Sequence, residues 1–405
     1  MHSRNITRCV TTAALLALAA VSLSALSGCK SGNTNTVGKE IIVGEYGALT
    51  GPQASFGKST NEGIQLATEQ ANAAGGIDGK TIKVVVEDDM SDAAKAEIAV
   101  KRLIDEEHVI AVLGEVASGS SLAGGQVCQQ AHIPMVSPSS TNPSVTQIGN
   151  DIFRVCFIDP FQAAVVARFV HDYLHVTRVA TFTNKSAPYS TGFTQNFITA
   201  FTGMGGQVIA QQSYGQQDTD YRGALSTIKA TNPQAILVPG YYTDAGAVCK
   251  QARDLGIKVP IVGGDGWDSQ LLFNIGGSAV NGCYFSDHVS MDNPSPVVQK
   301  FVQDYKARFG HTPDALAALA YDAANLTYAA MKRAKALTPD DIRAAIATTT
   351  DFPGVTGKIT IDANRNASKP AVIIGVQNGQ FKYVTTITDP SKPLSQQPAA
   401  PSGGQ

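Results

Sequence analysis

Between residues 40 and 290 the chain alternates short hydrophobic runs with longer stretches in which apolar and polar residues are mixed. The runs are rich in Val and Ile and show little polar alternation, as expected of parallel strands that helices cover on both faces. Regular alternation of strand and helix predicts a doubly wound α/β sheet. The first expected strands lie at 40–49, 81–89, 109–116 and 133–140, with helices near 61–74, 93–107 and 121–131.

A second series of strands and helices follows the sequence DIFRVCFIDPFQ at 151–162, which interrupts the first series. The pattern therefore predicts two α/β units of similar size. The expected strands of the second unit lie at 178–185, 207–214, 235–242 and 259–266, with helices near 162–174, 190–203, 221–230 and 243–255.

Residues 1–28 have the features of an export signal. They include Arg4 and Arg8 but no acidic residue, and their apolar stretch at 10–26 has the length of a signal h-region with its flanks. A retained membrane anchor is the alternative, but the stretch is short for a flanked membrane span and serines dilute it. We therefore expect a signal that is removed from the mature chain.

The residues Leu26-Ser27-Gly28-Cys29 resemble the signal box of bacterial lipoproteins. This resemblance implies that 1–28 is a lipoprotein signal peptide and that the Cys29 thiol carries lipid. We expect an exported lipoprotein on the periplasmic or cell-surface side of a membrane, with 29–39 as a flexible linker. No later apolar run is long enough to span a bilayer, so the lipid anchor is the only membrane contact expected. The choice between inner and outer membrane stays open.

The charge of the chain bears on its partners, and the composition of residues 389–405 bears on their structure. The chain has 31 basic and 33 acidic residues, which gives a formal net charge of −2. This balance argues against nucleic acid as a partner, because proteins that bind nucleic acid gather an excess of basic residues. Residues 389–405 are rich in Pro, Ser, Gln and Gly, and we expect them to form a disordered tail.

Four cysteines take part in a weak internal repeat. In each half of the chain a predicted helix carries one cysteine, a strand follows, and a second cysteine comes later. Four cysteines allow three pairings, and the repeat favours the disulfides Cys128–Cys156 and Cys249–Cys283. Four buried free thiols are the alternative, because cysteine is a common small core residue.

The chain resembles the leucine/isoleucine/valine-binding proteins, which are the type I periplasmic binding proteins of branched-chain amino acid ABC transporters. The resemblance covers nearly all of residues 40–384. It rests on strings that follow one another in the expected order and spacing, namely IIVGEYGALTGPQASFGKSTNEGIQLATEQANAAGGIDGK, VEDDMSDAAKA, VIAVLGEVASGSS, IPMVSPSSTNP, FRVCFIDPFQ and GGDGW.

The resemblance implies two α/β lobes joined by three hinge strands, with the ligand in the cleft between the lobes. The residues alone would make the helices after 292 a separate element, so a discontinuous first lobe depends on the resemblance. The hinge crossings are expected near 157–161, 286–291 and 362–372. Lobe 1 would consist of 40–158 plus 290–364, and lobe 2 of 159–289 plus 365–388.

Hydroxyl side chains follow two expected strands of the first unit. Ser118 in EVASGSSLAGG can cap a predicted helix, and Ser139 and Thr141 in VSPSSTNP follow the next strand. Open α/β sheets bind ligands at the carboxyl ends of their strands, where N–H groups and hydroxyls can hold a carboxylate. The resemblance implies that these three residues hold the ligand carboxylate. Ordinary loop capping is the alternative for each of them alone.

The ligand ammonium needs a carboxylate, and Asp265 in VGGDGWDS lies between glycines at an expected strand end. The resemblance aligns Asp265 with an acidic residue, usually Glu, that pairs with the ligand ammonium. It also implies that Tyr189 and Tyr241 line the cleft and that Phe56 closes over the ligand side chain. Trp267 is a further candidate that no motif position supports. Core or loop packing is the alternative for each aromatic residue.

The chain departs from the well-known branched-chain binders at a disulfide of the first lobe. The positions that match its two cysteines are Ser91 and Ala117 here. Together with the shorter Asp265, this departure leaves the identity of the native ligand open.

Motifs of the main enzyme classes are missing from the sequence, which contains no G-x-S-x-G elbow, no G-x-G-x-x-G fingerprint and no P-loop. His171 and His175 have the spacing of a zinc pair on a helix, but no third ligand is evident. We therefore expect a protein that is not an enzyme and needs no cofactor and no metal.

The predicted function is capture of a small amino acid, branched-chain or related, in an interlobe cleft. A monomeric lipoprotein would deliver this ligand to the permease of an ABC transporter. The alternative is a ligand-sensing module that presents an amino acid, an amide or a small carboxylate to a receptor, because the same body would serve either role.

Overall fold

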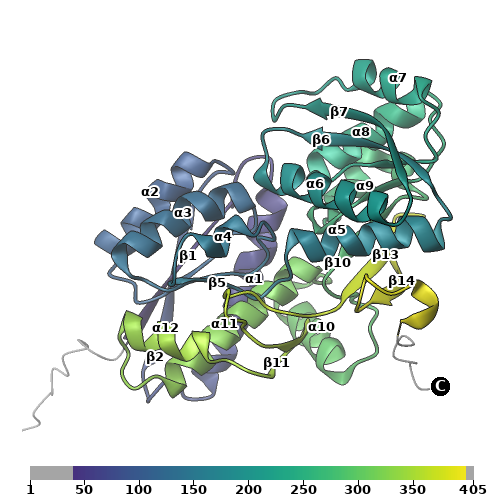
Figure 1. The fold of residues 1–405 in the computed structure, drawn as a ribbon. Helices are drawn as coiled ribbons and strands as arrows, with labels where there is room; N and C mark the ends of the chain where they lie inside the picture. Colours follow the sequence, from purple (N-terminus) through teal and green to yellow (C-terminus); the bar gives the residue numbers. More distant parts are fainter. Residues whose placement is uncertain (1–39, 398–405) are drawn as a thin grey trace, which may run out of the picture. The chain divides into compact units, whose positions relative to one another are not determined.

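A computed structural model of the protein describes residues 40–397 (Figure 1). The predicted signal peptide 1–28, the lipidation site Cys29, the linker 29–39 and the last residues 398–405 lie outside the described residues. Residues 40–397 form two α/β lobes, each built on its own largely parallel sheet, which confirms the predicted fold class.

The sheet of the first lobe has five parallel strands in the order β2-β1-β3-β4-β5. Ile41 and Val43 of β1 share a hydrophobic cluster with helices α1 and α11, whereas Tyr46 shares another with α2 and α3. Because helices cover both faces, the strands need no polar side. The elements are β1 (Glu40–Gly47), α1 (Ala54–Ala73), β2 (Thr81–Asp88), α2 (Ala93–Asp105), β3 (Val112–Leu113), α3 (Ser118–Ala131), β4 (Met135–Ser137), α4 (Ser144–Gln147) and β5 (Ile152–Arg154).

The sheet of the second lobe has seven strands in the order β14-β13-β10-β9-β8-β6-β7. The strands from β6 to β10 are parallel, and β13 and β14 add an antiparallel hairpin next to β10. The elements are α5 (Asp159–Arg168), β6 (Arg178–Asn184), α6 (Pro188–Gly203), β7 (Gln207–Tyr214), α7 (Arg222–Ala230), β8 (Ala235–Leu237), α8 (Tyr242–Asp254), β9 (Ile261–Gly263), α9 (Leu271–Gly276), β10 (Tyr284–Asp287), β13 (Ala371–Gln377) and β14 (Gln380–Ile387).

Between β10 and β13 the chain packs on the first lobe again, through α10 (Pro296–Phe309), α11 (Ala315–Arg333), α12 (Pro339–Ala347) and the hairpin β11 (Phe352–Gly354) and β12 (Gly357–Ile359). Helix α11 lies along α1, where the Thr68 and Tyr328 hydroxyls are 2.7 Å apart. The two backbones approach closely at Gly63, since a Cβ at this position would lie 2.2 Å from the Ala317 carbonyl oxygen.

Three connections join the two lobes within residues 40–397. They run from β5 to α5, from β10 to α10 and from β12 to β13. Their positions bring residues 155–158, 288–295 and 360–370 between the lobes, close to the expected hinge crossings.

The expected tail differs from the structure in its first part. Residues 389–397 contact the second lobe, where the Pro390 carbonyl accepts a hydrogen bond from Arg168 Nε at 3.0 Å. The Leu394 N–H donates to Asp172 Oδ2 at 3.0 Å, and the Leu394 side chain packs against a hydrophobic cluster. These contacts correct the expectation of disorder for 389–397.

The four cysteines in the described part of the chain are buried and not bonded to one another. Cys128 and Cys156 belong to different hydrophobic clusters, so the predicted disulfide between them is wrong. The sulfurs of Cys249 and Cys283 lie 3.8 Å apart without a bond. Free thiols, the alternative interpretation, therefore describe this structure.

Considering residues 40–397 only, the structure contains no helix that combines the length and apolar character needed to cross a membrane.

Candidate ligand-binding site

A small cavity lies where strand ends of the two lobes meet. The first lobe contributes apolar and hydroxyl side chains, and the second lobe contributes Tyr189, Asp265 and Gly266. The cavity brings together most of the residues singled out in the sequence. Its lining consists of Phe56, Val116, Ser118, Ser139, Thr141, Tyr189, Asp265, Gly266 and Leu316.

Two loops at the carboxyl ends of β3 and β4 form the hydroxyl side of this cavity. The Ser118 hydroxyl accepts a hydrogen bond from the Asn142 N–H at 3.3 Å, and the Ser121 and Ser140 hydroxyls lie 2.7 Å apart. These bonds connect the first turn of α3 to the loop that follows β4. The expected capping role of Ser118 is wrong, because α3 begins at Ser118 with Ala117 as its N-cap residue and no side chain caps it.

Ser139 stands out on this side because its hydroxyl oxygen has no hydrogen-bond partner among the described residues, although the residue is buried. A buried hydroxyl that lacks a partner costs about 1–3 kcal/mol. Buried polar groups are normally satisfied, so this hydroxyl is suited to receive a polar atom of a ligand.

Arg154 lies behind the second loop and is completely buried. Its guanidinium donates to the Ser140 carbonyl and, at 2.8 Å, to the Asn142 carbonyl. The planar fork of an arginine can hold two acceptors in fixed geometry. Arg154 thereby fixes the loop that carries Ser139 and Thr141.

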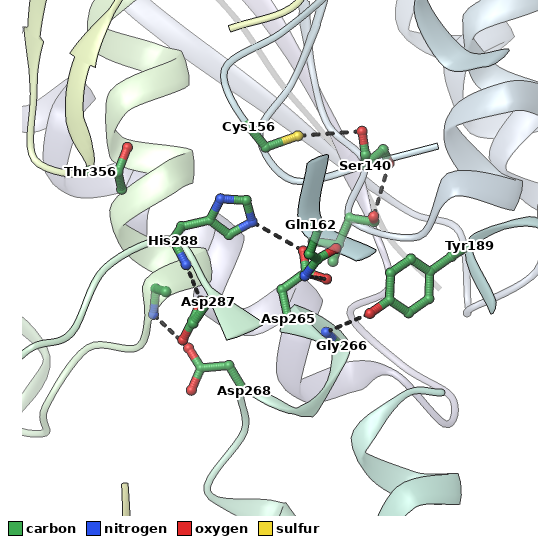
Figure 2. Close-up of polar contacts among 12 residues, drawn as sticks. Ser140, Cys156, Gln162, Tyr189, Asp265, Gly266, Asp268, Asp287, His288 and Thr356 are labelled. Atoms are coloured by element: carbon green, nitrogen blue, oxygen red, sulfur yellow. Dashed lines mark hydrogen bonds and ion pairs between the residues drawn. The ribbon is translucent and has the colours of Figure 1, made fainter. Parts of the chain in front are cut away.

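Asp265 provides the acidic side of the cavity. It begins a short 3₁₀ helix (Asp265–Trp267) that follows β9, and its carboxylate is almost entirely buried. Gln162 Nε2 donates to Asp265 Oδ1 at 2.8 Å, and His288 Nε2 lies 3.1 Å from Asp265 Oδ2 (Figure 2). Next to Asp265, the Gly266 N–H donates to the Tyr189 hydroxyl at 3.4 Å.

A second carboxyl group, that of Asp159, lies near this side at the start of α5. It is fully buried, and neither of its oxygens accepts a well-formed hydrogen bond from a described residue. Burial raises the pKa of Asp159 to about 8, while the nearby Thr141 hydroxyl lowers it and Asp265 raises it further. Two buried acidic groups therefore lie close to one another on this side of the site.

Aromatic rings surround the cavity on its remaining sides. Tyr189 stacks on Tyr241 with ring centroids 5.5 Å apart, and the Phe56 ring meets Tyr241 edge-on at 5.8 Å. Tyr241 thus stands behind the two lining rings. Trp267 points away into the core of the second lobe, where its Nε1–H donates to the Val238 carbonyl at 3.0 Å.

Hydrogen bonds around the cavity join the two lobes directly. The Tyr242 hydroxyl donates to the Pro52 carbonyl at 2.9 Å, and the Ser55 and Ser269 hydroxyls lie 2.7 Å apart. On the other side Asn142 Nδ2 donates to the Pro188 carbonyl at 2.8 Å. The structure therefore has the lobes closed on one another.

Sequence reasoning missed Asp159, Gln162 and His288. Asp159 and Gln162 belong to the string FRVCFIDPFQ, where an Asp-Pro pair before a helix is explained by helix initiation alone. His288 lies in an expected hinge crossing, and no local pattern marks it.

The histidine pair with zinc spacing does not form a site. His175 lies beyond the end of the π-helix Phe169–Tyr173 with a φ of 55°, and His171 Nδ1 contacts Asp172 at 2.7 Å. Across residues 40–397 there is no group of three or more His, Cys, Asp or Glu side chains able to hold a metal ion.

Several known proteins that this chain is similar to are described as amino acid binding proteins. Leu/Ile/Val-binding protein homolog 1 of Brucella suis is 26% identical over 353 residues, which is 85% of this chain and 93% of that protein. The crystal structure of a leucine binding protein from Thermotoga maritima superposes with a TM-score of 0.83 at 38% identity, over 87% of this chain and all of that chain.

A branched-chain amino acid transporter substrate-binding protein of Streptococcus pneumoniae, solved with isoleucine, has a TM-score of 0.82 at 33% identity. Its alignment covers 87% of this chain and all of the other. Residues 40–380 match the family described as periplasmic binding protein. With its two α/β lobes and the cavity between them, this chain belongs to the periplasmic binding protein family, whose members bind solutes and are not enzymes.

Proposed function

We propose that this protein is the extracytoplasmic solute-binding component of an ABC transporter and that it captures a branched-chain or related small amino acid for delivery to the permease. Relatives described as leucine-binding or solved with isoleucine support this assignment. The observation that carries it is that one cavity has hydroxyl groups on one side and a carboxylate on the other. The unpartnered hydroxyl of Ser139 lies on the first lobe, and the carboxylate of Asp265 lies on the second.

A free amino acid fits this pairing because its carboxylate and its ammonium lie a few ångströms apart. Ser118, Ser139 and Thr141 would receive the carboxylate, and Asp265 would receive the ammonium. Phe56 and Tyr189 would contact the side chain, and Tyr241 would support these two rings from behind.

Neither lobe alone offers both halves of the site, so binding is coupled to closure. The ligand shifts the balance between open and closed forms only through its better contacts with the closed form. The bonds of Tyr242 with Pro52 and of Ser55 with Ser269 support a closed form that is stable enough to dock on a permease.

The lipid anchor, the oligomeric state and the lobe boundaries are further parts of the proposal. The chain would be a monomer anchored through lipid on Cys29, with lobe 1 at 40–158 plus 290–364 and lobe 2 at 159–289 plus 365–388. Cys29→Ser is expected to release the protein from the membrane fraction or to leave its signal uncut. A variant that is cleaved and stays in the membrane like the wild type would refute the anchor.

A thermal-shift screen of the twenty amino acids, amides and small carboxylates, followed by titration calorimetry, tests the function. Asp265→Ala leaves a desolvated ammonium without its counter-charge, which costs on the order of 2–5 kcal/mol, or about thirty-fold to several thousand-fold in affinity. Asp220→Ala, at an exposed aspartate of the second lobe, is the matched control. Unchanged amino acid affinity in a folded Asp265→Ala variant would overturn the proposal in favour of a ligand without an amine.

A further inference from the structure

His288 joins the candidate site to two of the connections between the lobes. It directly follows β10, in the connection that leads to α10. Its ring stacks on Phe157, in the connection from β5 to α5, with centroids 3.8 Å apart and an interplanar angle of 21°. Both side chains are buried, and the Nε2 edge of the imidazole reaches Asp265 (Figure 2).

The hydrogen bonds of His288 define which nitrogen carries its proton. Burial lowers the pKa of His288, so the ring is neutral near pH 7 and has a single N–H. Nε2 lies 3.1 Å from the Asp265 carboxylate, whereas Nδ1 has no partner among the described residues. The proton therefore belongs on Nε2, which donates to Asp265. The His288 backbone N–H donates to Asp287 Oδ1 at 2.7 Å and fixes the residue further.

His288 and Gln162 together occupy one lone pair on each Asp265 oxygen. A carboxylate can accept about four hydrogen bonds, so at least one acceptor position is left even when the Tyr189 hydroxyl also binds Asp265. Both donors also fix the carboxylate in a buried region that contains the second carboxyl group of Asp159. A fixed, charged carboxylate with free lone pairs suits a primary ammonium and disfavours a ligand that carries only a carboxylate.

We propose that His288 is a positioning residue that makes the site selective for ligands with an α-ammonium, by orienting the Asp265 carboxylate through its Nε2–H. This inference rests on the proposed function. Through its stack on Phe157, His288 also ties the orientation of Asp265 to the connections that move when the lobes close.

Two substitutions separate the hydrogen bond from the packing. His288→Phe keeps an aromatic ring against Phe157 but loses the donor, whereas His288→Gln can place an amide N–H near the position of Nε2. The probes are L-leucine and 4-methylpentanoate, which is leucine without its amine, and calorimetry or competition gives the two affinities.

His288→Phe is expected to weaken leucine binding about 10- to 100-fold, because a hydrogen bond to a charged group is lost. It should change 4-methylpentanoate binding by less than about threefold, since that ligand makes no use of the Asp265 charge. His288→Gln should recover most of the leucine affinity. In an Asp265→Ala background, His288→Phe should have little further effect, because the two residues act as one unit.

The outcomes distinguish this inference from the function on which it rests. If the wild type binds no amino acid of the screen, or if Asp265→Ala leaves its amino acid affinity unchanged, both fail. If Asp265→Ala weakens leucine binding but His288→Phe does not, only the role of His288 is overturned. The role of His288 is also overturned if His288→Phe weakens the binding of both probes equally, or if His288→Gln binds leucine as weakly as His288→Phe does.

A spectroscopic measurement on the wild type covers the case in which His288→Phe does not fold. In histidine-labelled protein with leucine bound, the ¹⁵N spectrum should show His288 as the neutral Nε2–H tautomer, assigned by loss of its signals in His288→Gln. An Nδ1–H tautomer or a doubly protonated ring would overturn the proposal.

Discussion

The Asp268 carboxylate accepts the Ala315 backbone N–H at 2.7 Å, so a side chain of the second lobe caps the first turn of α11 on the first lobe. Asp314, the N-cap residue of α11, binds the Ala317 N–H at 2.8 Å with its own carboxylate. The first N–H groups of an α-helix have no partner within the helix. One of these groups in α11 is satisfied only while the lobes meet.

Loss of this interlobe bond should weaken ligand binding. Asp268→Ala leaves the Ala315 N–H without its partner in the closed form, which costs about 1–3 kcal/mol, or roughly 5- to 150-fold in leucine affinity. Burial and then the neighbouring Asp314 raise the pKa of Asp268 to about 8, so a neutral acceptor can do the same work. Asp268→Asn should therefore lose less. Calorimetry checks both, and an Asp268→Ala variant with wild-type affinity would contradict the role in closure.

The close approach of α1 and α11 should not tolerate a methyl group at Gly63. A Cβ there would lie 2.2 Å from the Ala317 carbonyl oxygen, so Gly63→Ala is expected to destabilise the fold by about 1–3 kcal/mol or more. Gly203→Ala at the end of α6 is the matched control, because a Cβ at that position meets nothing within 4 Å. Urea unfolding measures both variants, and equal stabilities would disprove the steric argument.

Glu45 should make the protein less stable as the pH rises. Burial raises its pKa from 4.5 to about 8, and the hydrogen bond from Asn61 only partly offsets this. The folded state therefore holds a proton that the unfolded state releases above pH 4.5. The stabilisation is complete below that pH and is lost as the pH rises towards 8, by on the order of 3–5 kcal/mol.

Glu45→Gln keeps an oxygen that accepts from Asn61 and removes the titration. Its melting temperature should exceed that of the wild type at pH 8 by more than at pH 5. Glu106→Gln, at an exposed position, is the control. Its melting temperature should differ from that of the wild type by the same amount at pH 8 as at pH 5. A parallel pH dependence of wild type and Glu45→Gln would show that Glu45 does not titrate in this way.

The sulfurs of Cys249 and Cys283 are close enough to be joined by a small movement in an oxidising compartment. Non-reducing peptide mapping of exported protein should find Cys249 linked to Cys283, and Cys128 and Cys156 free. The bond would close a loop worth about 3–4 kcal/mol in a chain-entropy model, so reduction should lower the melting temperature. Cys249→Ser should remove this response. Four free thiols in the exported protein would rule the link out.

The parallel strands could be predicted because burial on both faces leaves a local signature. The predicted strand at 207–214 has the bounds of β7, and Ser139, Thr141 and Asp265, which lie at the ends of predicted strands, come just after β4 and β9. The carboxyl ends of parallel strands meet at one edge of a sheet, so these polar residues converge for topological reasons. Short motifs were sufficient to find them.

The partners of Asp265 could not be found in this way. Gln162 and His288 are far apart in the chain and both reach Asp265 only because the tertiary fold brings α5 and the connection after β10 to the same place. The capping role expected of Ser118 failed for a related reason, since its hydroxyl is used by the Asn142 N–H of another loop. Local sequence predicts what a residue can bind, whereas tertiary contacts decide what it does bind.

The packing of α11 along α1 has a consequence for how the molecule is made. The parallel strands β6 to β10 come from one continuous stretch, but β13 and β14, which complete their sheet, come from the end of the described chain. Helix α1 is synthesised early but finds its partner only after α11 has emerged, and closing so long a loop is slow. Until then the apolar face of α1 stays uncovered. Delayed burial of this kind keeps a nascent chain unfolded for longer. This delay is an advantage for a protein that crosses a membrane before it folds.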